Sequence, residues 1–133
     1  MNERESRYRD KINFAIEKFE SIPSSGFDDD LIRDASFYKI QVSIESVIDI
    51  CAMLVRDIGK DVGDDYHNLD ILKEEKIISE NICENLKKLN GMRNILVHRY
   101  NKIEEELIFG KINDIRKIIF NFIEIVEDVI QGS

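Results

Sequence analysis

The sequence has few of the residues that break helices or cross-link a chain: one proline, six glycines and two cysteines in 133 residues. Because 43% of the residues are hydrophobic and 35% are charged, this scarcity indicates a helix-rich globular protein and excludes a disordered one. Cys51 and Cys83 both fall inside helical patterns, so we predict reduced thiols in a cytoplasmic protein rather than a disulfide. A chain of this length predicts one domain over residues 1–133 with a real hydrophobic core.

Other features are missing altogether. No apolar run reaches the roughly 18 residues that cross a bilayer, so no membrane association is predicted. The charged start, Met1–Glu5, has no apolar segment behind it, and we expect neither a signal nor a transit peptide. The sequence holds no glycine-rich phosphate loop and no nucleophile elbow. His67 follows Asp64–Tyr66 without paired ligand spacing, so we predict a solvated loop there, no metal and no cofactor.

Charge is distributed unevenly along the chain. The net charge of -8 argues against a broad surface that coats nucleic acid, but it does not exclude a small nuclease site. The window from Asn85 to Ile103 contains no acidic residue. Its basic residues are Lys87, Lys88, Arg93, Arg99 and Lys102. A positive segment in an acidic protein is a candidate site for a bound anion.

Apolar residues recur at steps of three and four, which predicts helices and no strands. The predicted helices cover residues 3–22, a long segment from Asp28–Asp30 to Ile58, residues 69–76, a segment after Ser79, and residues 104–130. The long second helix is apolar around much of its circumference, so it should lie at the centre. We predict an all-α protein, an antiparallel up-and-down bundle of four to five helices.

Capping and breaking residues set the predicted boundaries. Gly59 is expected to cap the C-terminus of the second helix and Ser79 the N-terminus of the fourth. Gly91 is expected to interrupt the fourth helix. Asn101, with Glu104 three residues later, resembles a capping box for the last helix.

The segment from Arg93 to Tyr100 combines three chemically useful side chains. Arginine recognises phosphate with a permanent planar charge, and the His98 imidazole can exchange a proton near neutral pH. Beside a tyrosine hydroxyl, these groups predict phosphate-ester chemistry, provided that they converge. On a regular helix Arg93 and Tyr100 share the apolar stripe, whereas His98 lies nearly opposite, close to Asn94. Either the helix ends or distorts near His98 so that the ring swings toward Arg93, or a second copy of the chain completes the site, or the arginine reaches around the helix.

Purely structural roles remain open for the same residues. An arginine on an apolar stripe needs a partner, and Arg93 could form a salt bridge to a carboxylate on another helix, such as Asp34, Glu45 or Asp49. His98 is equally compatible with a surface histidine or one bonded to a backbone carbonyl. Tyr100 is compatible with a half-buried aromatic at a helix end.

The pattern Arg93-x4-His98-x-Tyr100, with Asn94 after the arginine and Val97 before the histidine, resembles the HepT toxins of the HEPN superfamily. Ile78–Ser79, Leu86–Leu89 and Gly91–Met92 also resemble that family, as does the order of a long second helix, a polar loop and a long final helix. The resemblance covers most of the chain and is specific over residues 77–101.

The resemblance implies a HEPN-like bundle that forms a homodimer, with two copies of the motif meeting at a cleft. It implies the toxin of a type VII-like toxin–antitoxin module that acts as a metal-independent endoribonuclease. The partner would be an MNT-type nucleotidyltransferase antitoxin that silences the toxin by adding AMP to the motif tyrosine, here Tyr100.

These residues suit metal-free RNA cleavage, which needs a base, an acid and positive charge on the phosphorane. His98 is the predicted base or acid, and Arg93 would hold the scissile phosphate. Asn94 would orient His98 or the phosphate, and Tyr100 would stack on a base or bond a phosphate oxygen. Arg99 and Lys102 are further candidates for RNA binding, and a 2′,3′-cyclic phosphate is the expected product.

Two other functions remain open. The chain could be a non-catalytic helical partner, or substrate-binding subunit, of a nucleotidyltransferase, which suits the net charge of -8. It could also be an interaction bundle without chemistry. The intact Arg93, His98 and Tyr100 favour the ribonuclease.

Overall fold

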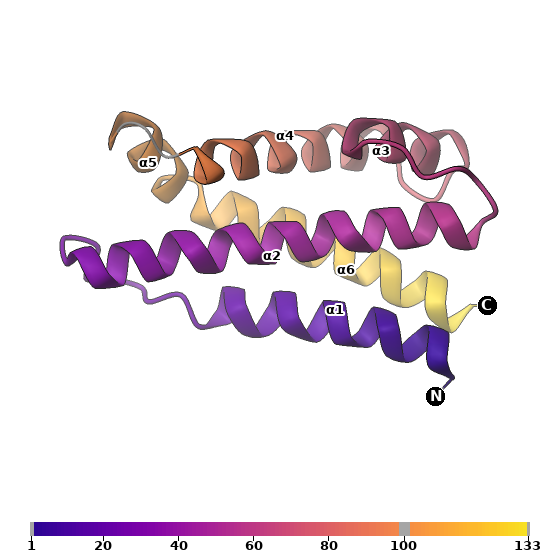
Figure 1. Ribbon diagram of the computed structural model, residues 1–133, viewed down its shortest axis with the longest axis horizontal. Helices are drawn as coiled ribbons and strands as arrows, with labels where there is room; N and C mark the ends of the chain where they lie inside the picture. Colours follow the sequence, from indigo (N-terminus) through magenta and orange to yellow (C-terminus); the bar gives the residue numbers. More distant parts are fainter. Residues whose placement is uncertain (1, 99–101, 133) are drawn as a thin grey trace.

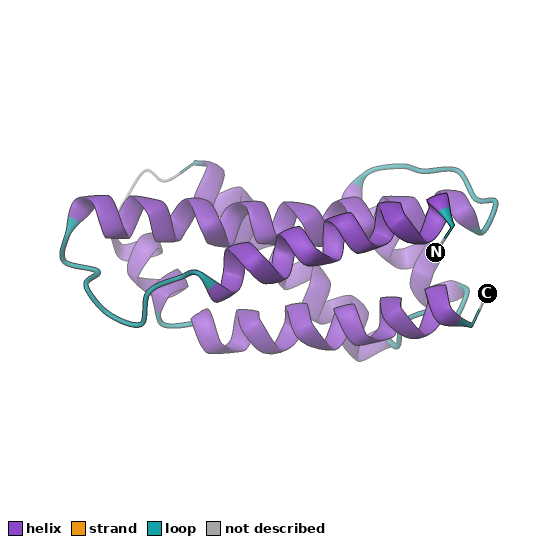
Figure 2. Ribbon diagram, turned by 90° about the horizontal axis from the view of Figure 1, so that it is seen from below, coloured by secondary structure: helices purple, strands orange, loops and turns teal. Residues whose placement is uncertain are grey.

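The computed structural model describes the backbone of residues 2–98 and 102–132, and the side chains of these residues apart from 102–104. Over these residues the chain forms helices and loops without a strand, which confirms the all-α prediction (Figure 2). The helices are α1 (Glu3–Glu20), α2 (Asp30–Asp57), α3 (Asp65–Glu74), α4 (Glu80–Val97), α5 (Lys102–Phe109) and α6 (Ile112–Gln131).

Helix α2 runs through the middle of an up-and-down bundle (Figure 1). It packs against α1 on one side and against α3 and α4 on the other, while α6 closes the bundle against α1 and α4. The two ends of the described chain lie at the same end of the molecule. The helices enclose one apolar core, whose largest fully buried side chains include Tyr8, Phe19, Phe37, Phe122, Leu54, Leu72, Leu89 and Leu96. Burial of this apolar surface is the main force that holds the bundle together.

Side-chain caps begin the first four helices, at Asn2, Asp29, Asp64 and Ser79. Each cap accepts a hydrogen bond from an amide that has no partner inside its helix. At the other end of α2, Gly59 has a φ of +80°. The amides of Gly59 and Lys60 donate back to the carbonyls of Arg56 and Val55, at 3.0 and 3.1 Å, which is a Schellman motif. The predicted caps at Ser79 and Gly59 are therefore confirmed.

The start of α3 differs from the prediction. The helix begins at Asp65, four residues before the expected Leu69, because the Asp64 carboxylate accepts a hydrogen bond from the His67 amide at 2.8 Å. This bond closes the first turn. His67 is consequently exposed on a helix and not in a loop, so that expectation was wrong.

Two glycines act differently from the prediction. Gly91 does not interrupt α4, which is continuous from Glu80 to Val97. Leu89 and Leu96 are buried on either side of it, and this packing outweighs the cost of about 1 kcal/mol for a glycine in a helix. The predicted helix over residues 104–130 is instead divided between α5 and α6, and the division falls at Gly110–Lys111.

Aromatic packing accounts for the division between α5 and α6. The Phe109 ring centroid lies 4.4 Å from that of Phe37 and 4.5 Å from that of Phe27. The Arg33 guanidinium lies 4.8 Å from the same ring. These contacts hold the last residue of α5 against α2 and the loop before it, directly before the break at Gly110–Lys111. The predicted capping residue Asn101 lies outside the described residues.

Both cysteines are free and buried, which confirms the prediction of reduced thiols. Burial raises the pKa of the Cys51 thiol, and it also raises that of Cys83, so neither side chain is a reactive thiolate at neutral pH. Among the described residues no helix is long and apolar enough to cross a membrane.

Candidate active site at the end of helix α4

Helix α4 directs Arg93 toward α3. Leu86, Leu89 and Asn90 are buried on one face of α4, and Arg93 follows Asn90 by three residues, so its side chain leaves from the same face. Only 24% of the Arg93 side chain is exposed. An arginine this far buried requires a counter-charge.

The Arg93 partner is Asp65, in the first turn of α3. Nη2 of Arg93 donates to Oδ2 of Asp65 at 3.0 Å and to Oδ1 of the buried Asn90 at 3.2 Å. Nε of Arg93 is buried and has no hydrogen-bond partner among the described residues. The carboxylate thus comes from α3 rather than from α2, where the candidates Asp34, Glu45 and Asp49 lie.

A second ion pair joins the same two helices. Lys87 of α4 donates to Oδ1 of Asp70 of α3 at 2.8 Å. This hydrogen bond lowers the pKa of the Asp70 carboxyl and raises the pKa of the Lys87 ammonium. Two basic residues of the acid-free window, Lys87 and Arg93, are therefore engaged in holding α3 to α4.

His98 is the C-cap of α4. The helix ends at Val97, and the His98 backbone has φ -109° and ψ 37°, with its amide donating to the carbonyls of Asn94 and Ile95 at 3.2 Å each. The side chains of His98 and Asn94 are exposed. Helix α4 therefore ends next to His98, but this ending alone does not bring the imidazole to the Arg93 side of the helix.

Within one chain Arg93 and His98 leave different sides of α4. Five residues along a helix rotate by one complete turn and about 140° more. The Arg93 side chain therefore faces α3, whereas the His98 side chain faces outward. Of the other predicted site residues, Arg99 and Tyr100 lie outside the described residues. Lys102 begins α5, but its side chain is likewise outside the description.

A small cavity adjoins the ion pair. Asp65, Asn68, Cys51 and Leu89 are among its lining residues, and its volume is about 10 Å³. That volume accommodates about one water molecule and no nucleotide. Any substrate of this region must therefore bind at the surface.

Comparison with known proteins decides the family. Residues 10–126 match the family described as "Ribonuclease HepT-like". The chain belongs to the HepT-like ribonuclease family. Two curated relatives, both from Archaeoglobus fulgidus and both named "Putative RNase", support the assignment. One is 43% identical over 128 residues, covering 96% of each chain, and the other is 38% identical over 101 residues, covering 76% of each.

Solved structures confirm the fold of this HepT-like chain. A tri-AMPylated HEPN toxin from Shewanella oneidensis, solved in complex with an MNT antitoxin, matches with a TM-score of 0.77 at 23% identity, covering 96% of this chain and 98% of that one. The cytosolic protein YutE of Bacillus subtilis, of unknown function, matches with a TM-score of 0.83 at 19% identity, covering 96% and 91%. The predicted HEPN-like bundle is thereby confirmed.

Asp65 and Asn90 were not predicted from the sequence as partners of Arg93 in this HepT-like site. A local signal existed for each. Asn90 precedes Arg93 by three residues, which places the two side chains together on a helix. Asp64 and Asp65 are adjacent acids before an apolar helical segment, a pattern typical of a helix start.

Proposed function

We propose that the protein is the ribonuclease toxin of a toxin–antitoxin module and that it cleaves RNA without a metal, using Arg93 and His98. The observation that carries the proposal is an exposed histidine at the end of α4, five residues after an arginine that a carboxylate holds in place. Membership of the HepT-like family and the 43% identical relative named "Putative RNase" support it.

In the proposed reaction an imidazole removes the proton of the RNA 2′-hydroxyl, whose oxygen attacks the adjacent phosphorus. The bond to the 5′-oxygen breaks, a second imidazole protonates that oxygen, and a 2′,3′-cyclic phosphate remains. Arg93 neutralises the charge that develops on the phosphoryl oxygens. Its Nη2 is bonded to Asp65 and Asn90, which leaves the Nη1 amino group without a partner among the described residues. Asn94, one residue after Arg93, and Tyr100 are proposed to orient the substrate.

A second copy of the chain would supply the second imidazole. Ile95, Val97 and Leu107 expose 36%, 48% and 59% of their surface, and the first two precede His98 by three residues and by one. Exposed apolar side chains close to a catalytic candidate suit a protein interface. A homodimer that forms through this end of α4 would bring two His98 side chains to one cleft. The second copy would in this way compensate for the separation of Arg93 and His98 within one chain.

We further propose that an MNT-type nucleotidyltransferase antitoxin silences the toxin by adding AMP to Tyr100 in the cytoplasm. The AMPylated HEPN toxin in complex with an MNT antitoxin supports this partner. AMP groups would bring bulk and negative charge to a site that must accept polyanionic RNA. Arg99 and Lys102 flank Tyr100 in sequence and are proposed to contact RNA.

Cleavage of a labelled RNA in excess EDTA tests the activity. His98→Ala and Arg93→Ala should each lower the cleavage rate at least 100-fold, the scale of a lost acid–base group or phosphate contact. Matched controls are His67→Ala, which removes the other exposed histidine, and Arg116→Ala, which removes another arginine in a single ion pair. Equal rates for the site variants and the controls would contradict the proposal.

The second candidate is a non-catalytic partner of a nucleotidyltransferase. The Arg93–Asp65 ion pair favours it, because a paired arginine has a structural role without any reaction. Expression of the chain alone in growing cells separates the two. A toxin stops growth and recovers on co-expression of the antitoxin, whereas a binding subunit leaves growth unchanged.

A further inference from the structure

A groove of about 380 Å³ lies between α4 and α6, away from the Arg93–Asp65 ion pair. Asn85, Lys88 and Met92 line it from α4, at the helical spacing of three and four residues that places side chains on one face. Lys111, Lys117 and Asn121 line it from α6 and the residue before it. The Arg93 side of α4 faces α3 instead, so the groove and the ion pair occupy different faces of one helix.

The groove is basic although the protein is acidic. Its lining carries three lysines, Lys88, Lys111 and Lys117, against one carboxylate, Asp114. All three lysines are exposed, and none forms an ion pair with another described residue. Three lysines that line one groove, outside the ion pairs among the described residues, form a candidate site for several negative charges at once.

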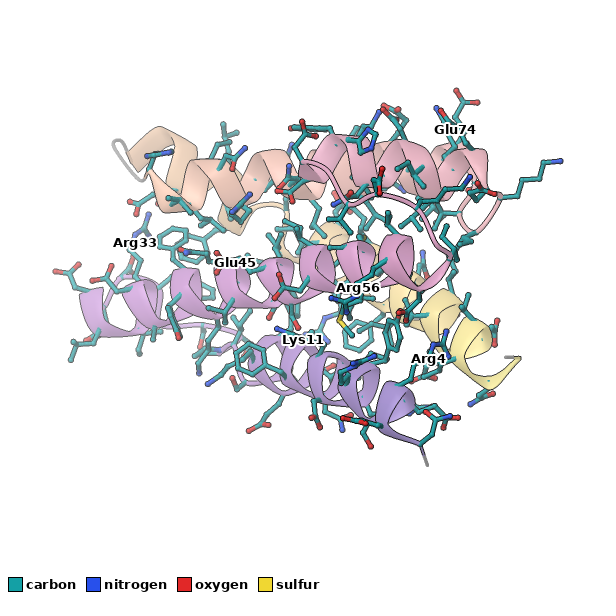
Figure 3. The ribbon with its side chains drawn as sticks, turned by 45° about the vertical axis from the view of Figure 1, so that its right-hand side comes forward. Arg4, Lys11, Arg33, Glu45, Arg56 and Glu74 are labelled. Carbon is teal, nitrogen blue, oxygen red and sulfur yellow. The ribbon has the colours of Figure 1, made fainter. Side chains whose placement is uncertain are left out.

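Two other grooves have the opposite charge, whereas a third, beside Pro23 and Phe109, has Arg116 as its single charged lining residue. The groove between α1 and α2 has Lys11 as its single cation, and Figure 3 shows Lys11 and Glu45 on these facing helices. It also contains Asp10 and Asp49. The groove beside Arg33 is lined by five carboxylates, those of Asp28, Asp30, Asp34, Glu105 and Glu106. The positive charge of the α4–α6 groove is therefore local and does not reflect the composition of the chain.

The groove also has the right direction and length for an RNA strand. Lys111 and Asn121 are ten residues apart, which is about 15 Å along α6. That length accommodates about four phosphates at the roughly 3.4 Å charge spacing of a stacked strand. On α4, Met92 at the groove precedes His98 by six residues, about 9 Å along the helix axis. Those six residues also leave His98 about 120° around the helix axis from Met92, so a strand that leaves the groove there must pass partly around α4 to reach His98.

We propose that the α4–α6 groove binds the phosphates of single-stranded RNA through Lys88, Lys111 and Lys117 and guides the strand toward His98. Asn85 and Asn121 provide amide groups that can donate to sugar or phosphate oxygens. The contacts are to the backbone, so this groove contributes affinity rather than sequence preference. The identity of the ligand rests on the proposed ribonuclease function.

The test uses two variants with the same net charge. One carries Lys88→Gln, Lys111→Gln and Lys117→Gln, and the control carries Lys18→Gln, Lys73→Gln and Lys76→Gln. Both are made in the His98→Ala background, so that a fluorescent 20-nucleotide single-stranded RNA stays intact during titration. Binding is measured by anisotropy as a function of salt concentration.

The groove variant should bind this RNA roughly 10- to 50-fold more weakly than the control at about 0.15 M salt, and its log–log salt slope should be smaller by about 2. In the active background the same lysine changes should raise KM for the 20-nucleotide RNA and leave cleavage of a dinucleotide unchanged, because a dinucleotide is too short to occupy both the groove and the His98 region.

Equal affinity and equal salt slope for the two variants would overturn the groove proposal, while cleavage that depends on His98 would still stand. Conversely, loss of RNA binding in the groove variant without any cleavage by the wild type would refute the nuclease and leave the groove as an RNA site. If the groove variant binds RNA normally but loses association with the nucleotidyltransferase, the groove is a protein interface and the proposal fails.

Discussion

The ion pair between Arg93 and Asp65 should couple α4 to α3 measurably, and its removal is the sharpest structural test of the candidate site. Asp65→Asn keeps an oxygen near Nη2 of Arg93 and removes only the negative charge. The two charged atoms are 3.0 Å apart, and the side chains are 24% and 34% exposed. The pair is thus more buried than an ordinary surface ion pair.

The free energy of unfolding that is lost in Asp65→Asn should lie between two known limits. Exposed ion pairs contribute about 0.2 to 1 kcal/mol, whereas breaking a fully buried pair costs about 3 to 5 kcal/mol. Because an amide oxygen replaces the carboxylate, we expect Asp65→Asn to lower the free energy of unfolding by about 1 kcal/mol. For a chain of 133 residues the corresponding fall in Tm is about 3 to 4 °C.

A double-mutant cycle isolates this interaction from the loss of either side chain. Asp65→Asn, Arg93→Met and the double variant are unfolded in urea, and the coupling free energy should be about 1 kcal/mol. The control is the same cycle on Arg116 and Glu20, which form a 2.8 Å ion pair with side chains 40% and 50% exposed. Its coupling should stay below about 0.5 kcal/mol. Equal coupling in the two cycles would show that Arg93 is not held in the way described.

Two further predictions concern stability. Gly91→Ala should raise the free energy of unfolding by about 0.5 to 1 kcal/mol in urea, because a Cβ at this helical position meets no atom within 4 Å; a loss of stability would mean that another surface packs there. Burial, followed by the 2.6 Å hydrogen bond that Tyr8 donates to Asp57, raises the pKa of Tyr8. The stabilisation that the protonated Tyr8 hydroxyl provides is complete below pH 10 and is lost as the pH rises toward the folded-state pKa. Alkaline destabilisation, followed by circular dichroism, should therefore be weaker in Tyr8→Phe.

Two glycines illustrate what could and could not be predicted from the sequence. Both Gly91 and Gly110 follow an apolar helical pattern, and a break was expected at the first and not at the second. The structure reverses both expectations. Gly91 lies between Leu89 and Leu96, which are buried in the core, whereas Gly110 follows Phe109, whose ring packs on Phe37. The deciding contact joins residues 72 positions apart and has no local signature.

The candidate site, like the helix boundaries, was predicted from the sequence only in part. Residue types and spacing predicted Arg93 and His98 as candidates. Helix α4 does end at Val97, but the Arg93 guanidinium faces α3 and the two side chains do not meet through this ending. A carboxylate on another helix was expected as a possible partner of Arg93, and the three examples considered all belong to α2. The structure places the partner, Asp65, in the first turn of α3.

The sequence by itself determined the helical class, the caps at Gly59 and Ser79 and the family, because helix periodicity and capping act over three or four residues and can be read locally. Only the tertiary structure decided which carboxylate holds Arg93, since Asp65 is 28 residues away. It also decided which lysines share a groove. Lys88 and Lys117 belong to different helices, and only the packing of α4 against α6 brings their charges together.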